Sequence, residues 1–217
     1  MRLCKLAPSQ RVEGRWLLHL EDGSILRVGE NEVVAFALYA GMELSPETLE
    51  ELREAADRAA LREKALKALS LRPLSRKELL RKLTARPRVK PGEEPPEPVD
   101  PQKAEEVADW LEELGYLNDE EYARSVARHY AAKGYGARKL RDELFRRGVS
   151  RDLWDQALDE VEDPAEEIDR FIAKKMRGED PRDPKALKRT SDALARRGYG
   201  WEEIREGLLR YGADQDD

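Results

Sequence analysis

Beyond residue 60, apolar residues recur at intervals of three or four along almost the whole chain. Typical pairs are Leu79 and Leu83, Leu140 and Leu144, and Ile204 and Leu208. This spacing places apolar side chains on one face of an α-helix. Counting one helix that ends near Leu71, the pattern predicts nine helices, so we expect this part of the chain to be all-α.

Residues that favour helix starts precede most of these apolar patterns. Ser and Asn followed by Glu three residues later form capping boxes, and Asp followed by Pro favours the first helical turn. The predicted starts, in chain order, are Ser75, Asp100, Asn118, Gly136, Ser150, Asp163, Asp183 and Gly200. Glu78 and Glu121 complete the boxes that open at Ser75 and Asn118.

The first sixty residues have a different pattern. In residues 15–29, "RWLLHLEDGSILRVG", the pair Asp22-Gly23 separates two apolar runs and predicts a β-hairpin. A short helix is expected next, with Asn31 as N-cap and Gly41 as its end. Ser45, followed by proline, is expected to cap another helix. Residues 1–60 are therefore predicted to form an N-terminal extension of a hairpin and short helices.

The helical region contains an internal repeat. Placing Gly148 on Gly198 aligns Leu144 with Leu194, whereas a rival alignment places "KGYG" (133–136) on "RGYG" (197–200). The number of predicted helices favours the first alignment, because only that one pairs second helices with second helices. Helical units that cannot bury their apolar faces alone do so by stacking.

We therefore expect three tandem three-helix repeats, at 61–117, 118–162 and 163–212, forming an elongated, curved body. Residues 86–101 are rich in proline and lack an apolar pattern, so they are predicted to form an exposed loop within the first repeat. Residues 213–217 are expected to fray.

The composition favours small helical units over a single thick core. Forty per cent of the residues are charged, and only 3 Phe are present. The abundance of Arg and Glu is typical of thermophile surfaces. A single cysteine, Cys4, excludes a disulfide within the chain and suits a reducing cytoplasm. The longest apolar run, at 33–40, is too short to span a membrane, and the N-terminus lacks the hydrophobic core expected of a signal sequence. We expect a cytoplasmic monomer.

The sequence contains no pattern typical of catalysis. His19 and His129 lie in different contexts, and no His, Cys and carboxylate cluster has the spacing of metal ligands. The "GYG" motifs lack the Lys-Ser/Thr ending of a phosphate-binding loop, and no nucleophile elbow is present. We expect a protein that is not an enzyme and needs neither cofactor nor metal.

The net charge of −6 conceals alternating basic and acidic segments. Residues 72–90 hold eight Lys/Arg and one Glu, whereas residues 91–121 hold twelve Asp/Glu and one Lys. Residues 133–151 are basic again, and 152–169 contain no basic residue. The electrostatic potential at a surface depends on charges within roughly a Debye length, about 8 Å at physiological salt. Anionic partners therefore remain candidates for the basic segments, in spite of the negative net charge.

The basic residues gather on the second helices of the predicted repeats. The helical period points Lys139 and Arg146 away from the buried stripe, with Arg138 and Arg147 beside it. A charge-rich protein carries charges on all its surfaces, and this alone explains any single basic segment. It does not explain why the second helices are basic while the third helices are acidic. The candidate partner- or phosphate-binding residues are Arg138, Lys139, Arg146, Arg147, Arg196, Arg197, Arg76, Lys77, Arg81 and Lys82.

Three aromatic residues adjoin these basic helices: Tyr135, Tyr199 and Trp201. Exposed aromatic rings stack on nucleic-acid bases. Core or capping contacts are the favoured interpretation for all three.

Three segments carry a family resemblance: "LSRKELLRKL" (74–83), "VADWLEELGYLNDEEYARSVARHYAAKGYGARKLRDELFRRGVSRDLWDQAL" (107–158) and "LARRGYGWEEIREGLL" (194–209). They resemble the bacterial RecX family, which regulates the RecA recombinase. The joint "GYLNDEE" followed by "KGYG" and then "RRG" is its most specific part. The longer proline-rich loop departs from the family pattern.

The resemblance implies three-helix repeats without catalytic residues or cofactors. It also implies binding along the groove of the RecA filament on single-stranded DNA, across neighbouring subunits, with weak binding to DNA itself. Inhibited ATP hydrolysis, inhibited strand exchange and net filament loss would follow, which affects recombinational repair and the SOS response. Two other functions stay open: a nucleic-acid-binding helical protein that acts without RecA, and a scaffold for another protein.

Overall fold

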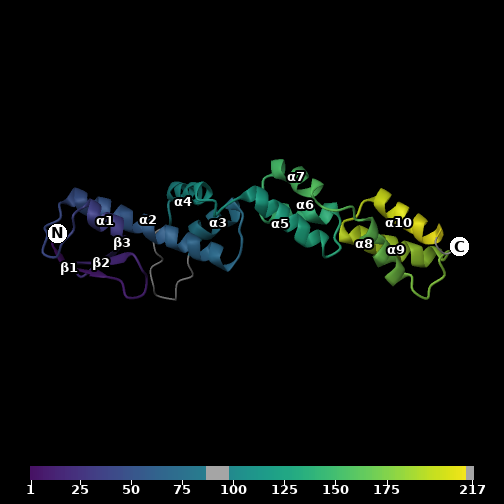
Figure 1. Cartoon of the computed structure of the whole chain (residues 1–217), viewed down its shortest axis with the longest axis horizontal. Coiled ribbons are helices and arrows are strands. Elements are labelled where there is room, and N and C mark those ends of the chain that lie inside the picture. The colour runs from purple at the N-terminus through teal and green to yellow at the C-terminus, as the bar shows by residue number, and fades with distance from the viewer. Residues whose placement is uncertain (87–97, 214–217) are drawn as a thin grey trace. The chain divides into compact units, whose positions relative to one another are not determined.

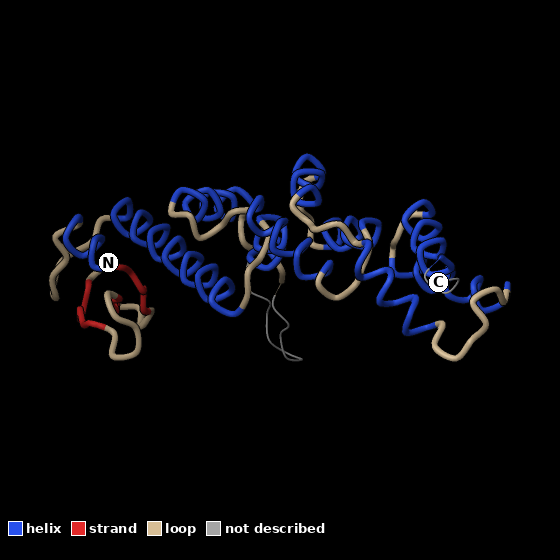
Figure 2. The backbone as a smooth tube through the Cα atoms, turned by 45° about the vertical axis from the view of Figure 1, so that its right-hand side comes forward, coloured by secondary structure: helices blue, strands red, loops and turns tan. Residues whose placement is uncertain are grey.

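The computed structural model describes residues 1–86 and 98–213, and in these residues the chain is mostly helical. The strands of the described residues all lie near the N-terminus, as the red segments of Figure 2 show. This confirms the expected fold class, mostly helical with a small N-terminal β element. The predicted proline-rich loop and the predicted frayed tail lie largely outside the described residues.

The N-terminal β element is a three-stranded antiparallel sheet and not the predicted hairpin alone. Strands β1 (Leu3–Pro8), β2 (Arg15–Leu20) and β3 (Ile25–Gly29) pair in the order β1-β2-β3. The predicted hairpin is present as β2 and β3, with Gly23 at a φ of +83° in its turn. The prediction missed β1, because Leu3 is its only buried residue and the strand lacks a regular alternation of apolar side chains.

The helix after the sheet differs from its prediction. Helix α1 spans Glu30–Ala35, and the Gly29 backbone N–H donates to the Glu32 carboxylate at 3.0 Å. Asn31 therefore lies inside the first turn and is not the N-cap. The helix also ends well before Gly41. The Glu32 carboxylate thus caps the Gly29 N–H, and this fixes an earlier start than Asn31 indicated.

Helix α2 (Pro46–Leu71) is one continuous helix of 26 residues. Its N-cap is the predicted one, since the Ser45 hydroxyl accepts from the Thr48 backbone N–H at 3.0 Å. The expected end of the extension at residue 60 falls inside this helix. No glycine or proline interrupts the sequence between residues 47 and 71, so nothing stops the helix there.

The described residues divide into two compact units. The helices and strands that form them are labelled in Figure 1. The first unit consists of Met1–Arg72 and Leu79–Tyr116, and the second consists of Pro73–Glu78 and the chain from Leu117 onward. Helix α3 (Arg76–Thr84) thus contributes its first turn to the second unit. Helix α4 (Pro101–Glu113) begins behind the predicted cap Asp100, which accepts from the Gln102 N–H at 2.9 Å.

Six helices follow in the second unit and form two successive groups. The first group is α5 (Asp119–Ala131), α6 (Ala137–Arg146), the 3₁₀ turn η1 (Arg151–Leu153) and α7 (Trp154–Asp159). The second group is α8 (Ala165–Lys175), α9 (Pro184–Arg197) and α10 (Trp201–Ala213). Each group encloses its own apolar cluster, one around Leu140 and Leu144 and one around Ile172 and Leu194. The helices of the two groups lie within residues 118–162 and 163–213, the region predicted to hold the second and third repeats.

The two second helices of these groups end in the same way. Gly148 after α6 and Gly198 after α9 have φ values of +73° and +94°. The Val149 N–H donates to the Leu144 carbonyl at 3.1 Å, and the Tyr199 N–H donates to the Leu194 carbonyl at 3.3 Å. This is the hydrogen bonding of a Schellman helix end. The shared geometry supports the alignment of Gly148 with Gly198.

Candidate functional site

The start of α6 lies directly on the end of α9. The Gly136 N–H donates to the Arg197 carbonyl at 3.0 Å, and the Arg138 N–H donates to the Gly198 carbonyl at 3.1 Å. A Cβ atom on Gly136 would lie 2.5 Å from the Gly198 carbonyl oxygen, and one on Gly198 would lie 2.5 Å from the Lys139 nitrogen. Only glycine at both positions permits this contact, which we call the glycine joint.

A related contact links the start of α3 to the end of α6, within the second unit. The Ser75 hydroxyl donates to the Arg147 carbonyl, next to the end of α6. The Arg76 N–H donates at 2.7 Å to the carboxylate of Asp119, which begins α5. A Cβ atom on Gly148 would lie 2.9 Å from the Cβ atom of Lys77. In both cases the first residues of one helix therefore meet the C-terminal end of a later helix: those of α6 meet the end of α9, and residues 75–77 meet the end of α6.

The side chain of Arg147 is engaged inside the protein. Its guanidinium donates to the Tyr122 hydroxyl at 3.1 Å and to the Tyr130 hydroxyl at 3.3 Å. The Tyr122 hydroxyl in turn donates to the buried Glu78 carboxylate at 3.0 Å, and the buried Glu143 carboxylate lies 4.0 Å from Arg147 Nε. We call Arg147, these two tyrosines and these two glutamates the Arg147 network.

The protonation states within the Arg147 network follow from burial and hydrogen bonding. Burial opposes the charge of Arg147, but hydrogen bonds to the Tyr130 and Tyr122 hydroxyls outweigh it and raise the pKa of its guanidinium. Burial raises the pKa of the Tyr122 phenol, although the Arg147 guanidinium acts against this. The network therefore holds a charged arginine and a neutral tyrosine at neutral pH.

Arg197, at the corresponding position of α9, is also engaged within the protein. Its guanidinium donates to the Gly134 carbonyl at 3.1 Å and lies 4.5 Å from the centroid of the Phe171 ring. Arg147 and Arg197 were both predicted to bind a partner. Both guanidinium groups are held by these contacts within the protein.

The other predicted basic residues are more accessible. Arg138, Arg146 and Arg196 are exposed, and Lys139 is half-buried. Arg146 and Lys139 both pair with the buried Glu143 carboxylate, Lys139 at 3.5 Å. Arg138 and Arg196 form no ion pair with other described residues. In α3, Lys77, Arg81 and Lys82 are exposed, while Arg76 is half-buried.

One basic position recurs in all three second helices. Lys77, Arg138 and Lys188 are all exposed. Each lies six residues before a fully buried leucine, namely Leu83, Leu144 and Leu194. The structure therefore gives the three helices one accessible cation at an equivalent place, and we call these residues the recurrent cations.

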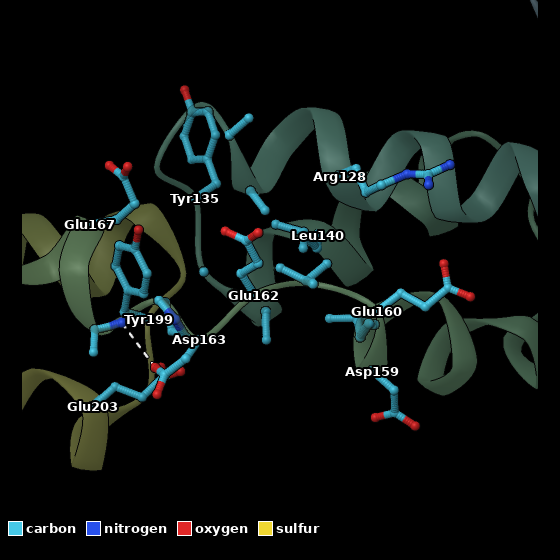
Figure 3. A pocket seen from close by; sticks show the side chains of 18 of the residues that line it. Arg128, Tyr135, Leu140, Asp159, Glu160, Glu162, Asp163, Glu167, Tyr199 and Glu203 are labelled. Atoms are coloured by element: carbon cyan, nitrogen blue, oxygen red, sulfur yellow. Dashed lines mark hydrogen bonds between the residues drawn. The ribbon is translucent and has the colours of Figure 1, made fainter.

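A cavity of about 830 Å³ lies between the second and third groups of helices, next to the glycine joint (Figure 3). Leu140, Tyr135 and Tyr199 contribute to its wall, and burial raises the pKa of the Tyr199 phenol. Its acidic lining residues are Asp159, Glu160, Glu162, Asp163, Glu166, Glu167 and Glu203. This lining repels phosphates, so the cavity does not extend the basic surface. Among residues 1–86 and 98–213, no group of His, Cys, Asp or Glu has an arrangement suited to a metal ion.

The aromatic residues near the basic helices have different environments. Tyr199 is buried in the apolar cluster of the third group and Tyr135 packs against that of the second, as expected. Trp201 is 69% exposed, which contradicts the expected core or capping contact. Phe145 on α6 is 67% exposed and was not predicted as a site residue. The helical period could have identified Phe145 from the sequence, because it separates Phe145 from Arg138 by only about 20° around the helix axis.

Comparison with known proteins gives a consistent result. Residues 118–158 match the family model described as "RecX, second three-helix domain". The chain is similar to "Regulatory protein RecX" of Cronobacter sakazakii (strain ATCC BAA-894), with 34% identity over 147 residues, 66% of this chain and 87% of the relative. It is also similar to "Regulatory protein RecX" of Serratia proteamaculans (strain 568), with 35% identity over 111 residues, which span 51% of this chain and 66% of that protein.

The fold also matches a solved structure. A crystal structure of regulatory protein RecX superposes with a TM-score of 0.68 and 20% identity, covering 94% of this chain and 97% of that one. The family model and the curated relatives define the class of protein, a mostly helical regulator that is not an enzyme. The chain belongs to the RecX family. None of the helices in the described parts of the chain is both long enough and apolar enough to span a membrane.

Proposed function

We propose that the chain binds the RecA nucleoprotein filament and lowers its activity, as a regulator of recombinational repair and the SOS response. The observation that carries this proposal is the similarity to the RecX of Cronobacter sakazakii across 87% of that protein. RecA is the partner that follows from membership of the family.

The site we propose for this binding consists of the recurrent cations together with Arg146 and Arg196. A helical filament offers the same subunit surface at regular intervals, and equivalent cations on successive repeats suit such a surface. The glycine joint supports this assignment, because backbone contact fixes the spacing between α6 and α9. Several weak contacts at fixed spacing give high overall affinity without a single deep pocket.

In this mechanism the chain lies in the groove of the filament and bridges neighbouring RecA subunits. The cations meet carboxylates of RecA or phosphates of the DNA that the filament holds. A bridge between subunits restrains the conformational changes of RecA that accompany ATP hydrolysis and strand exchange. Both activities therefore fall, and filament loss is favoured. Contact with single-stranded DNA is weak, because acidic residues line the cavity beside the basic helices.

The test is the DNA-dependent ATPase activity of RecA on single-stranded DNA, measured with increasing amounts of the chain. We expect the activity to fall, and we expect weak, salt-sensitive binding to the same DNA without RecA. Unchanged ATPase activity together with tight binding to bare DNA would replace this proposal with a nucleic-acid-binding protein that acts alone. No effect in either experiment would indicate a scaffold for another protein.

A further inference from the structure

Phe145 lies among cations on the accessible side of α6. At about 100° per residue, Phe145, Arg141 and Arg138 fall within an arc of about 60°. Phe145 is 67% exposed and Arg138 is exposed without an ion pair among the described residues, while the Arg141 side chain is 47% exposed. We call these three residues the Phe145 patch. The whole patch belongs to the second unit.

The aromatic residue distinguishes the middle repeat from its neighbours. The position directly after the buried leucine holds Phe145 in α6, but it holds Thr84 in α3 and Ala195 in α9. The recurrent cations are therefore common to all three helices, whereas the exposed ring is confined to α6. Aromatic and arginine side chains are enriched in protein interfaces, where a few central residues supply most of the binding energy.

We propose that Phe145 anchors the α6 surface in an apolar cleft, rimmed by carboxylates, on the protein part of the RecA filament. This inference rests on the proposed function and names a residue for the same contact. Arg138 and Arg141 complement the acidic rim, and the ring fills the apolar centre. Charges at a rim chiefly control the rate of association, and a buried aromatic anchor chiefly controls the rate of dissociation.

The acidic neighbours of the patch favour a protein surface over a nucleic acid. Asp142 is exposed on the same side of α6, one turn after Arg138. Asp155, which is 87% exposed, lies 3.6 Å from Arg141. A continuous phosphate backbone would meet both carboxylates and be repelled. A protein surface carries charges of both signs and accommodates this mixture.

The experiment measures binding of the full chain to RecA filaments assembled with a slowly hydrolysed ATP analogue on immobilised single-stranded DNA. Phe145→Ala is compared with Leu209→Ala, which removes an apolar side chain of similar exposure, 66%, from α10. We expect Phe145→Ala to dissociate roughly tenfold faster or more, with an unchanged association rate. Leu209→Ala should behave as the unsubstituted chain, and Phe145→Trp should retain slow dissociation. Arg138→Glu should instead slow association, most strongly at low salt.

Equal dissociation rates for Phe145→Ala and the unsubstituted chain would overturn the inference while leaving the proposed function in place. Failure of the unsubstituted chain to bind filaments would overturn the proposed function and this inference with it. A loss of binding to bare single-stranded DNA on Phe145→Ala substitution, equal to the loss on filaments, would assign the patch to DNA. Because the ring is exposed, the thermal unfolding midpoint should not change, and this checks that each variant is folded.

Discussion

The second and third groups of helices use the same Arg-Arg-Gly sequence in two different ways. In the second group, Arg147 crosses to the phenols of Tyr122 and Tyr130 and joins a buried network. In the third group, Arg197 lies on the Phe171 ring and donates to the backbone of the preceding group at Gly134. The final arginine secures the end of a second helix in both groups, although its partners differ.

The contacts of these side chains separate cations that are held within the protein from cations that are accessible. From the sequence alone, Arg138, Arg146 and Arg147 are all candidates, because all three are basic residues of one predicted helix. The structure engages Arg147 internally and pairs Arg146 with Glu143, whereas Arg138 is exposed and unpaired among the described residues. The accessible basic surface is consequently smaller than the basic composition of the helix indicates.

The largest expected effect concerns the contact that both groups share. Gly136→Ala should destabilise the protein by about 3 kcal/mol, from overpacking and weakened hydrogen bonds between α6 and α9. Residue 136 has a φ of −82°, which any residue adopts, so backbone strain contributes nothing. Urea denaturation measures the change in the free energy of unfolding.

The matched control for the glycine joint is Gly212→Ala. A Cβ atom at Gly212 would meet nothing within 4 Å, and the residue lies within α10. Alanine favours helix more than glycine does, so this variant should be unchanged or slightly more stable. A stability of Gly136→Ala equal to that of the unsubstituted protein would show that the joint is not closely packed.

The next effect distinguishes the two final arginines. Arg147→Met should cost about 2–3 kcal/mol, because it leaves buried polar groups of the Arg147 network without their cation. Arg197→Met should cost about 1 kcal/mol, since it removes one hydrogen bond and one contact between a cation and an aromatic ring. Urea denaturation of both variants gives the comparison. Equal losses in the free energy of unfolding would mean that Arg147 and Arg197 stabilise the protein equally, contrary to the difference in their contacts.

The smallest effect is a change in stability at alkaline pH. The pKa of Tyr122 is raised in the folded protein, so its contribution is fully present below the ordinary tyrosine pKa of about 10. That contribution is lost as pH rises through the higher folded value. Tyr122→Phe should therefore flatten the decline in the free energy of unfolding above about pH 10.

Tyr39→Phe is the control for this pH dependence, because Tyr39 is 62% exposed. Its profile of stability against pH should match that of the unsubstituted protein. An unchanged alkaline decline in Tyr122→Phe would mean that Tyr122 ionises equally easily in the folded and unfolded states.

Local sequence patterns predicted most helix starts correctly. Asp100, Asn118 and Asp183 all accept hydrogen bonds from the first turns that they were expected to cap. Such caps depend on residues a few positions apart, so a sequence is enough to find them. Strand β1 was missed because its residues do not alternate regularly between apolar and polar, so no strand pattern marks them.

The prediction of the candidate site was limited because a local sequence pattern does not show which residues of different helices meet. The helical period placed Arg138 and Arg146 outside the core, and both are exposed. It carried no information that Tyr122 and Tyr130, on another helix, capture the Arg147 guanidinium. The glycine joint was also invisible, since glycine at 136 and 198 indicated helix boundaries and not an approach of one backbone to another.

The central claim is that the recurrent cations bind the RecA filament, and a charge-reversed variant tests it most directly. The variant carries Lys77→Glu, Arg138→Glu and Lys188→Glu. Its control carries Arg53→Glu, Arg58→Glu and Lys67→Glu, which reverse the same number of exposed charges on α2. Affinity for RecA filaments on single-stranded DNA is measured at physiological salt for both variants and for the unsubstituted chain. We expect the first variant to bind at least tenfold more weakly and the control to bind within about twofold of the unsubstituted chain. Equal affinities for the two variants would contradict the claim.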